Sequence, residues 1–138
     1  MGEYSAIGDG AEIYNLAPVH IGANSVVSQR SYLCTATHDY TKSHFPIYSL
    51  PIKIGPSAWI AAGAFLAPGI IVGEGAVVGA FSVVTKEVPP WTVCAGNPCR
   101  VIKVRQLNGS CEGKPHASDS SKNVELLEHE RAPSRGVK

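Results

Sequence analysis

Five histidines are the side chains of this sequence best suited to proton transfer or metal binding, because imidazole titrates closer to neutral pH than any other side chain. They are His20, His38, His44, His116 and His129. His38 and His44 share one polar stretch with Asp39 and Tyr40. Such a cluster can supply a general base with nearby substrate contacts, and imidazoles that converge on one point can bind zinc.

Basic residues are sparse over the first 107 positions, where only seven Lys and Arg occur. Three of these are Lys86, Arg100 and Lys103, which follow one another late in that stretch. Ammonium and guanidinium groups are common partners of phosphate, so the three are candidates for phosphate contacts. Three solvated surface charges are the alternative interpretation.

A branched aliphatic residue recurs every six positions through the middle of the chain. The longest run is Ile54, Ile60, Leu66, Val72, Val78 and Val84. A second register comprises Ile7, Ile13, Ile21, Val27 and Leu33, with a slip of two residues near Val19–His20. The residue after each aliphatic is small in nearly every repeat. A period of six fits neither the helical period of 3.6 nor the strand period of two.

This period predicts a three-sided coil in which each side is a short strand and each corner a turn. Three repeats make one coil of about 18 residues, with the aliphatics pointing inward and the small residues allowing the corners. Stacked coils pair as parallel sheets, and stability comes from stacking because no coil buries its own core. About four coils at ~4.8 Å each give a prism ~20 Å tall.

The repeat is interrupted between Leu33 and Ile54, whose separation of 21 residues is not a multiple of six. The segment at about 39–51 is polar, aromatic and proline-bearing, and we expect it to leave the prism as a loop. Loops on a rigid scaffold commonly carry functional sites. The repeat ends near Pro89-Pro90, and we expect these prolines to stop further coiling.

These boundaries predict a single β-helix domain at residues 1–107 and a polar tail at 108–138. The chain has 138 residues, the length of one ordinary domain. The tail lacks the six-residue period and holds five basic and five acidic residues. We expect the tail to be disordered and assign it no chemistry.

Composition excludes several classes of protein. The net charge is +1, from 12 Lys and Arg against 11 Asp and Glu, which argues against a nucleic-acid binder. Ile54–Gly73 is uncharged and long enough to span a membrane, but its two prolines and four glycines favour turns, so no span is expected. The cysteines form no CxxC pair and no leader precedes them, so we expect reduced thiols and a cytoplasmic location. They are Cys34, Cys94, Cys99 and Cys111.

Three stretches, together with the repeat, resemble the hexapeptide-repeat acyltransferases. They are Leu33–Tyr40 (LCTATHDY), Trp59–Gly63 (WIAAG), and Val83–Trp91 (VVTKEVPPW) continued by Gly96–Lys103 (GNPCRVIK). Within that family the stretches look most like the sugar O-acetyltransferases of colanic-acid and exopolysaccharide clusters, and next like galactoside and maltose acetyltransferases. The resemblance covers roughly residues 7–105. It implies an all-β fold, the left-handed parallel β-helix.

The same resemblance implies transfer of an acetyl group from acetyl-CoA to a sugar hydroxyl, without a metal. His38 would be the general base, and Asp39 would orient its ring or contact the sugar as a second catalytic residue. Tyr40 and His44 would contact the acceptor. The expected coenzyme A contacts are Trp59, Ala62, Ala80, Thr85, Lys86, Arg100 and Lys103.

Particular roles follow within that set of coenzyme A contacts. The resemblance implies that Trp59 flanks the base and that the Ala62 backbone donates to the oxyanion. Ala80 and Thr85 would line the pantetheine and adenine, and the three basic residues would meet the phosphates. The resemblance also implies a homotrimer whose sites lie between subunits, with His38 of one subunit facing the Lys86 side of another.

Three other interpretations stay open. One is an N-acyltransferase acting on an amino sugar or a small amine. Another is a non-catalytic or truncated trimeric β-helix, because family members usually carry several dozen residues before the first coil, including part of the acceptor site. A third is a zinc enzyme of the same fold, since His20, His38 and His44 are 18 and six residues apart, so that two of them can stack one coil apart.

Overall fold

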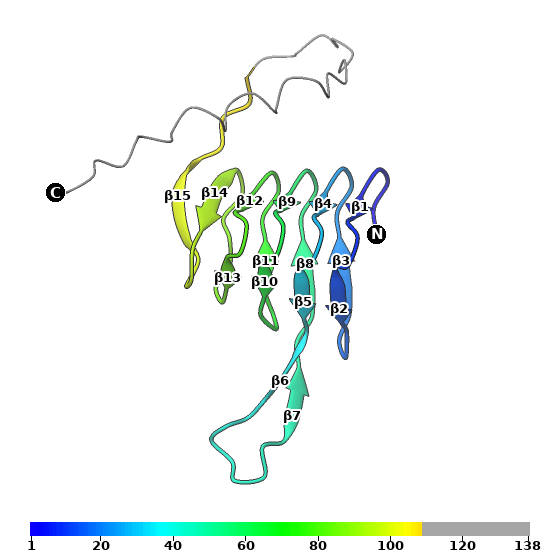
Figure 1. Cartoon of the computed structure of the whole chain (residues 1–138), viewed down its shortest axis with the longest axis vertical. Helices are drawn as coiled ribbons and strands as arrows, with labels where there is room; N and C mark the ends of the chain where they lie inside the picture. Colours follow the sequence, from blue (N-terminus) through cyan, green and yellow to red (C-terminus); the bar gives the residue numbers. More distant parts are fainter. Residues whose placement is uncertain (109–138) are drawn as a thin grey trace, which may run out of the picture. The chain divides into compact units, whose positions relative to one another are not determined.

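The computed structural model of the chain describes residues 1–108, so the predicted tail lies outside the described residues except for Asn108. Three sheets form the sides of a prism (Figure 1). Sheet A contains β1 (Ala6–Ile7), β4 (Val26–Val27), β9 (Trp59–Ile60), β12 (Val77–Val78), β14 (Thr92–Ala95) and β15 (Arg100–Val104). Sheet B contains β2 (Glu12–Tyr14), β5 (Tyr32–Cys34), β10 (Phe65–Leu66) and β13 (Val83–Val84). Sheet C contains β3 (Val19–Ile21), β8 (Ile52–Ile54) and β11 (Ile71–Val72).

The chain passes from sheet A to B to C in each coil, and the corners are named AB, BC and CA accordingly. Within these three sheets neighbouring strands are parallel, except that β15 is antiparallel to β14. Trp59 lies beside Val77 and Phe65 beside Val83, which is the expected repeat of 18 residues. Four coils form, the last closed on sheet C by the Val72–Val88 bridge, and β14 begins a fifth. The predicted parallel β-helix of about four coils is confirmed. Over the described residues, no helix long and apolar enough to cross a membrane occurs.

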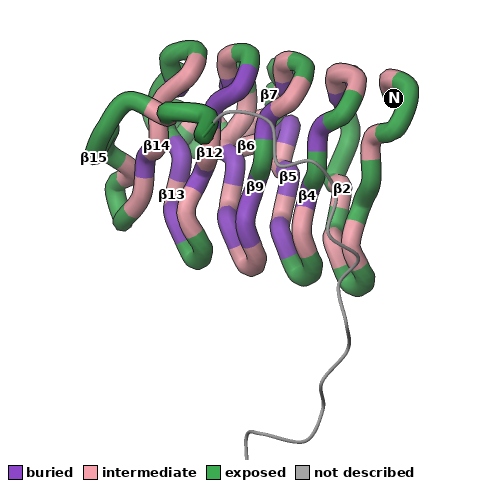
Figure 2. Tube along the Cα trace, turned by 90° about the horizontal axis from the view of Figure 1, so that it is seen from above, coloured by how far each residue is buried: buried purple, intermediate pink, exposed green. Residues whose placement is uncertain are grey.

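The inward aliphatics form the core along the prism axis (Figure 2). All six members of the longest run, Ile54 to Val84, are at most 3% exposed. Ile21, Val27 and Leu33 of the second register are also buried. Ile7 is 37% exposed because β1 is the first strand of sheet A and has a neighbour on one side only.

Small residues at the corners let successive coils approach closely. A Cβ on Gly22 would lie 2.4 Å from the Pro56 nitrogen, and one on Gly55 would lie 2.7 Å from the Glu74 nitrogen. A backbone neighbour cannot yield to such contacts without separating the coils. At corner CA the stacking distance therefore requires glycine after the aliphatic at these positions.

The prolines at 89 and 90 do not stop the coil, contrary to expectation. β14 follows them and pairs in parallel with β12. Pro90 occupies the CA corner position that Pro56 and Glu74 hold in the two preceding coils. Pro56 has no N–H, and the amide of Glu74 donates no backbone hydrogen bond within the described residues. Proline lacks an N–H, so it fits this position without losing a bond. The chain reverses one strand later, at residues 96–99, where β15 turns back along β14.

The insertion between β5 and β8 is a β-hairpin, whereas the sequence predicted a loop. β6 (Ala36–His38) and β7 (Ile47–Ser49) pair antiparallel, with His38 opposite Ile47. This hairpin, residues 36–49, is called the arm, and Figure 1 shows it projecting from the prism at corner BC. The ladder fixes the direction of the side chains at its base, including that of His38.

Arg105 fastens the end of the β-helix at corner CA. Its Nη1 donates to the Ser57 carbonyl at 2.9 Å and to the Gly75 carbonyl at 2.8 Å. Its guanidinium carbon lies 5.7 Å from the centroid of the Trp91 ring. The residue therefore ties three successive coils together.

Replacing Arg105 with alanine should lower the free energy of unfolding by about 1–3 kcal/mol, because two hydrogen bonds from a charged donor and a cation–π contact are lost. Urea denaturation followed by circular dichroism measures this change. Gln106→Ala, at the exposed neighbouring position, is the matched control and should change stability little. Equal losses in the two variants would show that Arg105 is not a fastening point.

Candidate active site

His38 lies at the end of β6 with its imidazole oriented by a backbone carbonyl. Its Nδ1 lies 2.6 Å from the carbonyl oxygen of Phe45, across the arm. A carbonyl oxygen only accepts, so Nδ1 carries the hydrogen, and in the neutral ring Nε2 keeps its lone pair. Within residues 1–108, Nε2 makes no hydrogen bond, and the side chain is exposed. The geometry therefore presents an outward-facing imidazole ready to accept a proton.

Phe45 adopts a conformation that is unusual for a residue with a side chain. Its φ is 45°, in the left-handed region. Such backbone strain persists where surrounding contacts hold it. Here the amide of Phe45 donates to the Lys42 carbonyl at 3.0 Å, while its own carbonyl receives the His38 ring. The role of Phe45 could not be found from the sequence, because a backbone carbonyl leaves no signature of residue type.

Asp39 does not orient the His38 ring in this structure. Its Oδ1 accepts from the Thr41 amide at 3.0 Å and from the Thr41 hydroxyl at 2.6 Å, and Lys42 Nζ lies 3.6 Å from Oδ2. These bonds, with those of Thr41 foremost, lower the pKa of the Asp39 carboxyl below its ordinary value. Asp39 thus shapes the turn of the arm, and its contact with a sugar stays a prediction.

The two predicted acceptor contacts also lie on the arm. Tyr40 is 84% exposed and His44 is exposed, so both side chains are available to a ligand or a partner. Four large apolar residues of the same region are exposed as well: Phe45, Ile47, Tyr48 and Leu50. The arm therefore presents far more apolar surface than a solvated loop needs.

The predicted thioester contacts lie at corner AB and on sheet A. Ala62 and Ala80 occupy the same corner position in successive coils, and the amide nitrogen of neither donates a hydrogen bond within the described chain. A free amide at Ala62 has the chemistry an oxyanion donor requires. Trp59 faces outward from β9, with its Nε1 donating to the Ser28 hydroxyl at 2.9 Å, which fixes the plane of the indole.

The predicted phosphate contacts lie at the C-terminal coils. Thr85 and Lys86 follow β13 at corner BC, whereas Arg100 and Lys103 belong to β15. All four are exposed. Among residues 1–108 the only ion pair joins Lys42 and Asp39, so the three basic groups have no carboxylate partner there. Their charges are available to an anionic ligand.

A single chain does not bring His38 and Ala62 together. The arm leaves at corner BC, whereas Ala62 lies at corner AB. Sheet B separates the two corners, and one side of five or six extended residues spans about 15–20 Å. Proton transfer requires heavy atoms about 3 Å apart. These residues can form one site only when the arm of one copy meets corner AB of another.

The zinc interpretation finds no support in the described part of the chain. No group of three His, Cys, Asp or Glu side chains there could hold a metal ion. His20 lies in β3 beside Lys53 of sheet C, and not beside the histidines of the arm. The 18-residue spacing of His20 and His38 does not stack them because the arm leaves the coil at residue 36.

The cysteines within residues 1–108 are free thiols. Cys94 is 2% exposed and faces the core. The pKa of Cys94 is raised to about 12, mainly because the thiol is buried and also because the Cys99 thiol lies beside it. Cys34 is half-buried on the outer side of β5.

We expect Cys94 to resist alkylation in the folded protein because its sulfur is covered and its thiolate is scarce at pH 8. Iodoacetamide labelling followed by peptide mass spectrometry should show Cys34 modified first and Cys94 modified only after unfolding. Rapid labelling of Cys94 in the native protein would contradict this burial.

Comparisons with known proteins agree with this architecture. The family described as "Bacterial transferase hexapeptide (six repeats)" matches residues 51–86. Over 105 residues the chain is 49% identical to a putative colanic acid biosynthesis acetyltransferase of Escherichia coli K12, covering 76% of this chain and 58% of the relative. Over the matched residues the chain is similar to the hexapeptide-repeat transferases. Its fold is accordingly the left-handed parallel β-helix.

Other known proteins are similar to the chain as well. The galactoside O-acetyltransferase of Escherichia coli K12 is 39% identical over 93 residues, which cover 65% of this chain and 45% of that protein. A galactoside acetyltransferase solved in complex with coenzyme A superposes with a TM-score of 0.67 at 33% identity, covering 74% of this chain and 56% of that one. A maltose O-acetyltransferase from Clostridium difficile gives 0.65 at 34% identity, with coverages of 75% and 60%. The chain thus spans less than two thirds of the length of these relatives.

Proposed function

We propose that this hexapeptide-repeat protein is an O-acetyltransferase that moves an acetyl group from acetyl-CoA to a sugar hydroxyl in surface-polysaccharide biosynthesis. The observation that carries the proposal is the His38 imidazole, held by the Phe45 carbonyl with Nε2 free. The similar colanic acid and galactoside acetyltransferases, and the coenzyme A complex of the latter type, support the choice of donor and acceptor.

The chemistry follows from these groups. Nε2 of His38 takes the proton of the sugar hydroxyl as its oxygen attacks the thioester carbonyl. The free amide of Ala62 donates to the oxyanion that forms. Collapse of the intermediate breaks the carbon–sulfur bond, and the imidazolium returns its proton to the departing thiolate. The products are the acetyl ester and coenzyme A.

The basic residues near the C-terminal end fit the phosphates of the substrate. Lys86, Arg100 and Lys103 are exposed and free of ion pairs within the described chain. Guanidinium and ammonium groups bind phosphate oxygens by charge-assisted hydrogen bonds. With the thioester at Ala62, acetyl-CoA would lie along the corner toward these residues, with Trp59, Ala80 and Thr85 beside its arm.

The active assembly we propose is a homotrimer with shared sites, located in the cytoplasm where acetyl-CoA is made. Support comes from the separation of His38 and Ala62 on different corners and from the apolar side chains exposed on the arm. Three copies around one axis let each arm reach the next subunit. Sedimentation equilibrium should give three times the chain mass, and a monomer would refute the shared site.

Acetyl-CoA consumption with a panel of sugars tests the proposed reaction. Turnover should appear with a sugar that offers hydroxyls only and yield an alkali-labile acetyl ester. Turnover confined to amino sugars would replace the proposal with N-acylation. Binding of coenzyme A without turnover on any acceptor would favour a non-catalytic β-helix.

Mixing two inactive variants tests the sharing of sites. His38→Ala lacks the base, and Ala62→Glu blocks the corner that receives the thioester. Co-expressed in equal amounts, they should recover about one quarter of the wild-type activity, because one site in four combines an intact arm with an intact neighbour. No recovery would mean that both groups act within one chain.

A further inference from the structure

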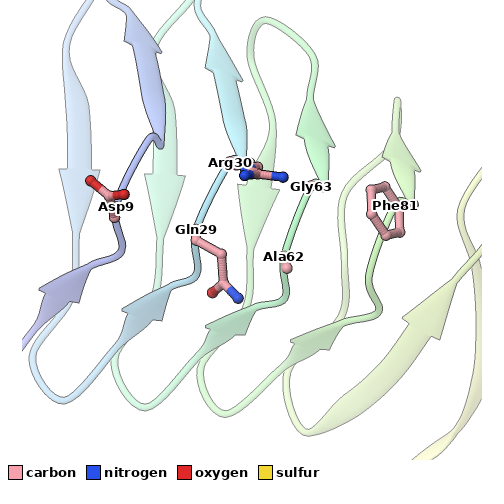
Figure 3. Close-up of a pocket in the computed structure, with 6 residues that line it drawn as sticks. All are labelled: Asp9, Gln29, Arg30, Ala62, Gly63 and Phe81. Atoms are coloured by element: carbon pink, nitrogen blue, oxygen red, sulfur yellow. The ribbon is translucent and has the colours of Figure 1, made fainter.

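A cavity of about 700 Å³ lies along corner AB across the first four coils (Figure 3). Its lining residues are Asp9, Gln29, Arg30, Ala62, Gly63 and Phe81. Ala62 is the only one of these that the sequence singled out. The cavity therefore adjoins the proposed thioester position, and four of its side chains have no assigned role.

One wall of the cavity is an aromatic ring held over a glycine. Phe81 is 78% exposed, and a Cβ on Gly63 would lie 2.6 Å from two carbons of its ring. Gly63 has a φ of 66°, a conformation that suits glycine. The absent side chain leaves room for the ring, which presents a flat apolar surface beside Ala62.

The opposite wall is polar and unpaired. The side chains of Gln29 and Arg30 make no hydrogen bond or ion pair within residues 1–108, and neither does Asp9. Asp9 and Arg30 are neighbours through a backbone bond of 3.1 Å, yet no ion pair joins their side chains. A carboxylate, an amide and a guanidinium together can satisfy the donors and acceptors of a polar ligand.

Arg105 shows how an arginine with a structural role behaves in the same fold. Its guanidinium donates to two backbone carbonyls and packs on Trp91. Arg30 lies at corner AB with a φ of 56°, and within residues 1–108 its side chain makes none of these contacts. Arg30 is thus placed in a cavity with its donors free, which is the arrangement of a ligand-binding arginine.

The residues that line the cavity belong to successive coils, so one end of the cavity lies nearer the proposed phosphate contacts than the other. Asp9 belongs to the first coil, Gln29 and Arg30 to the second, and Ala62 to the third. The proposed phosphate contacts belong to β13 and later elements. Coils rise by about 4.8 Å each, so Arg30 lies about one coil from the thioester position, on the side away from the phosphates.

We propose that this cavity holds the acceptor sugar and that Arg30 pairs with an anionic group on it, a carboxylate or a phosphate ester. The inference rests on the proposed function, since it takes Ala62 as the thioester position. Gln29 and Asp9, which lie on the same side of Ala62 as Arg30, bond the hydroxyls of the sugar. The acceptor class is therefore an acidic sugar, and Arg30 is a specificity-determining residue.

Titration calorimetry with three probes tests the site apart from turnover: methyl glucoside, methyl glucuronide and glucose 1-phosphate. The wild-type protein should bind an anionic probe at least about tenfold more tightly than the glucoside, as expected for a charged hydrogen-bonded pair. Arg30→Gln should remove this preference. Lys53→Gln, which removes one exposed charge on sheet C, should keep it. The two anionic probes distinguish a carboxylate from a phosphate.

The outcomes separate this inference from the proposed function. Three results would overturn the Arg30 assignment. Charged and neutral probes could bind equally, or neither anionic probe could bind. Arg30→Gln and Lys53→Gln could also lose the same amount of affinity for the anionic probe. If acetyl transfer is observed but binding shows no preference for charged probes, the proposed reaction is supported and the Arg30 site is refuted. If the preference for anionic probes depends on Arg30 but the protein transfers no acetyl group, the Arg30 site is supported and the proposed reaction is refuted.

Discussion

Replacing His38 with alanine should lower the rate of acetyl transfer by about 10²–10⁴-fold, the range over which a positioned general base accelerates such steps. The imidazole is the only group of the arm whose hydrogen-bonding pattern leaves a basic nitrogen free and oriented. Its removal does not disturb the prism, because the side chain is exposed and its one bond goes to the arm itself. Steady-state kinetics with a competent sugar measures the effect.

Two further measurements separate loss of a base from loss of structure. Coenzyme A affinity should be unchanged in His38→Ala, because the phosphate contacts lie on β15 and at corner BC beyond β13. Ser43→Ala, five residues along the same arm at an exposed position with no assigned role, is the control and should retain most of the turnover number. Near-normal turnover in His38→Ala would remove the imidazole from the mechanism.

The pH dependence of the arm can be predicted from Asp39. Its pKa is lowered in the folded state, mainly by the Thr41 hydroxyl and amide, so the ionised form stabilises the turn. That contribution is complete above the ordinary carboxyl value of 3.8 and is lost only as the pH falls through the lower folded value. A decline in activity between pH 8 and 5 therefore cannot arise from Asp39. Asp39→Asn should leave the shape of that pH profile unchanged.

Replacing Ile60 with alanine should lower the free energy of unfolding by about 2–5 kcal/mol, the usual range for a buried aliphatic truncated to alanine. Ile60 is 0% exposed and lies in the third coil, with core residues of the coils on both sides. Each coil contacts only its neighbours, so a cavity here weakens two stacking interfaces at once. Chemical denaturation measures the loss.

Ile71→Ala provides the matched control for this substitution. Ile71 has the same side chain in the same coil, but it points outward from sheet C and is 43% exposed. Its truncation should cost much less than that of Ile60, since little cavity is formed. Similar losses at the two positions would contradict the inward assignment that the repeat of six predicts.

The repeat determined the fold from the sequence alone, because its physics is local and periodic. An inward aliphatic every sixth residue and a small residue after it suffice to predict a three-sided coil. Ile60, Leu66 and Val78 are fully buried as that pattern requires. The same reasoning failed at Pro89-Pro90, where proline suits a corner nitrogen that donates no bond.

The resemblance predicts His38 as the base, but only the tertiary structure showed how its ring is held. The Phe45 carbonyl is seven residues away and reaches the imidazole because β6 and β7 pair. The separation of His38 from Ala62 is likewise decided by the corners at which the arm and the third coil turn. Neither fact depends on the type of any one residue.

The cavity at corner AB was beyond sequence analysis for the same reason. In the sequence Arg30 is indistinguishable from any exposed surface charge. Only the stacking of coils places it one coil from Ala62, in a cavity that Phe81 also lines. A period states which residues point inward. Which outward residues become neighbours depends on the chain insertions between coils, and these are fixed only when the coils are stacked.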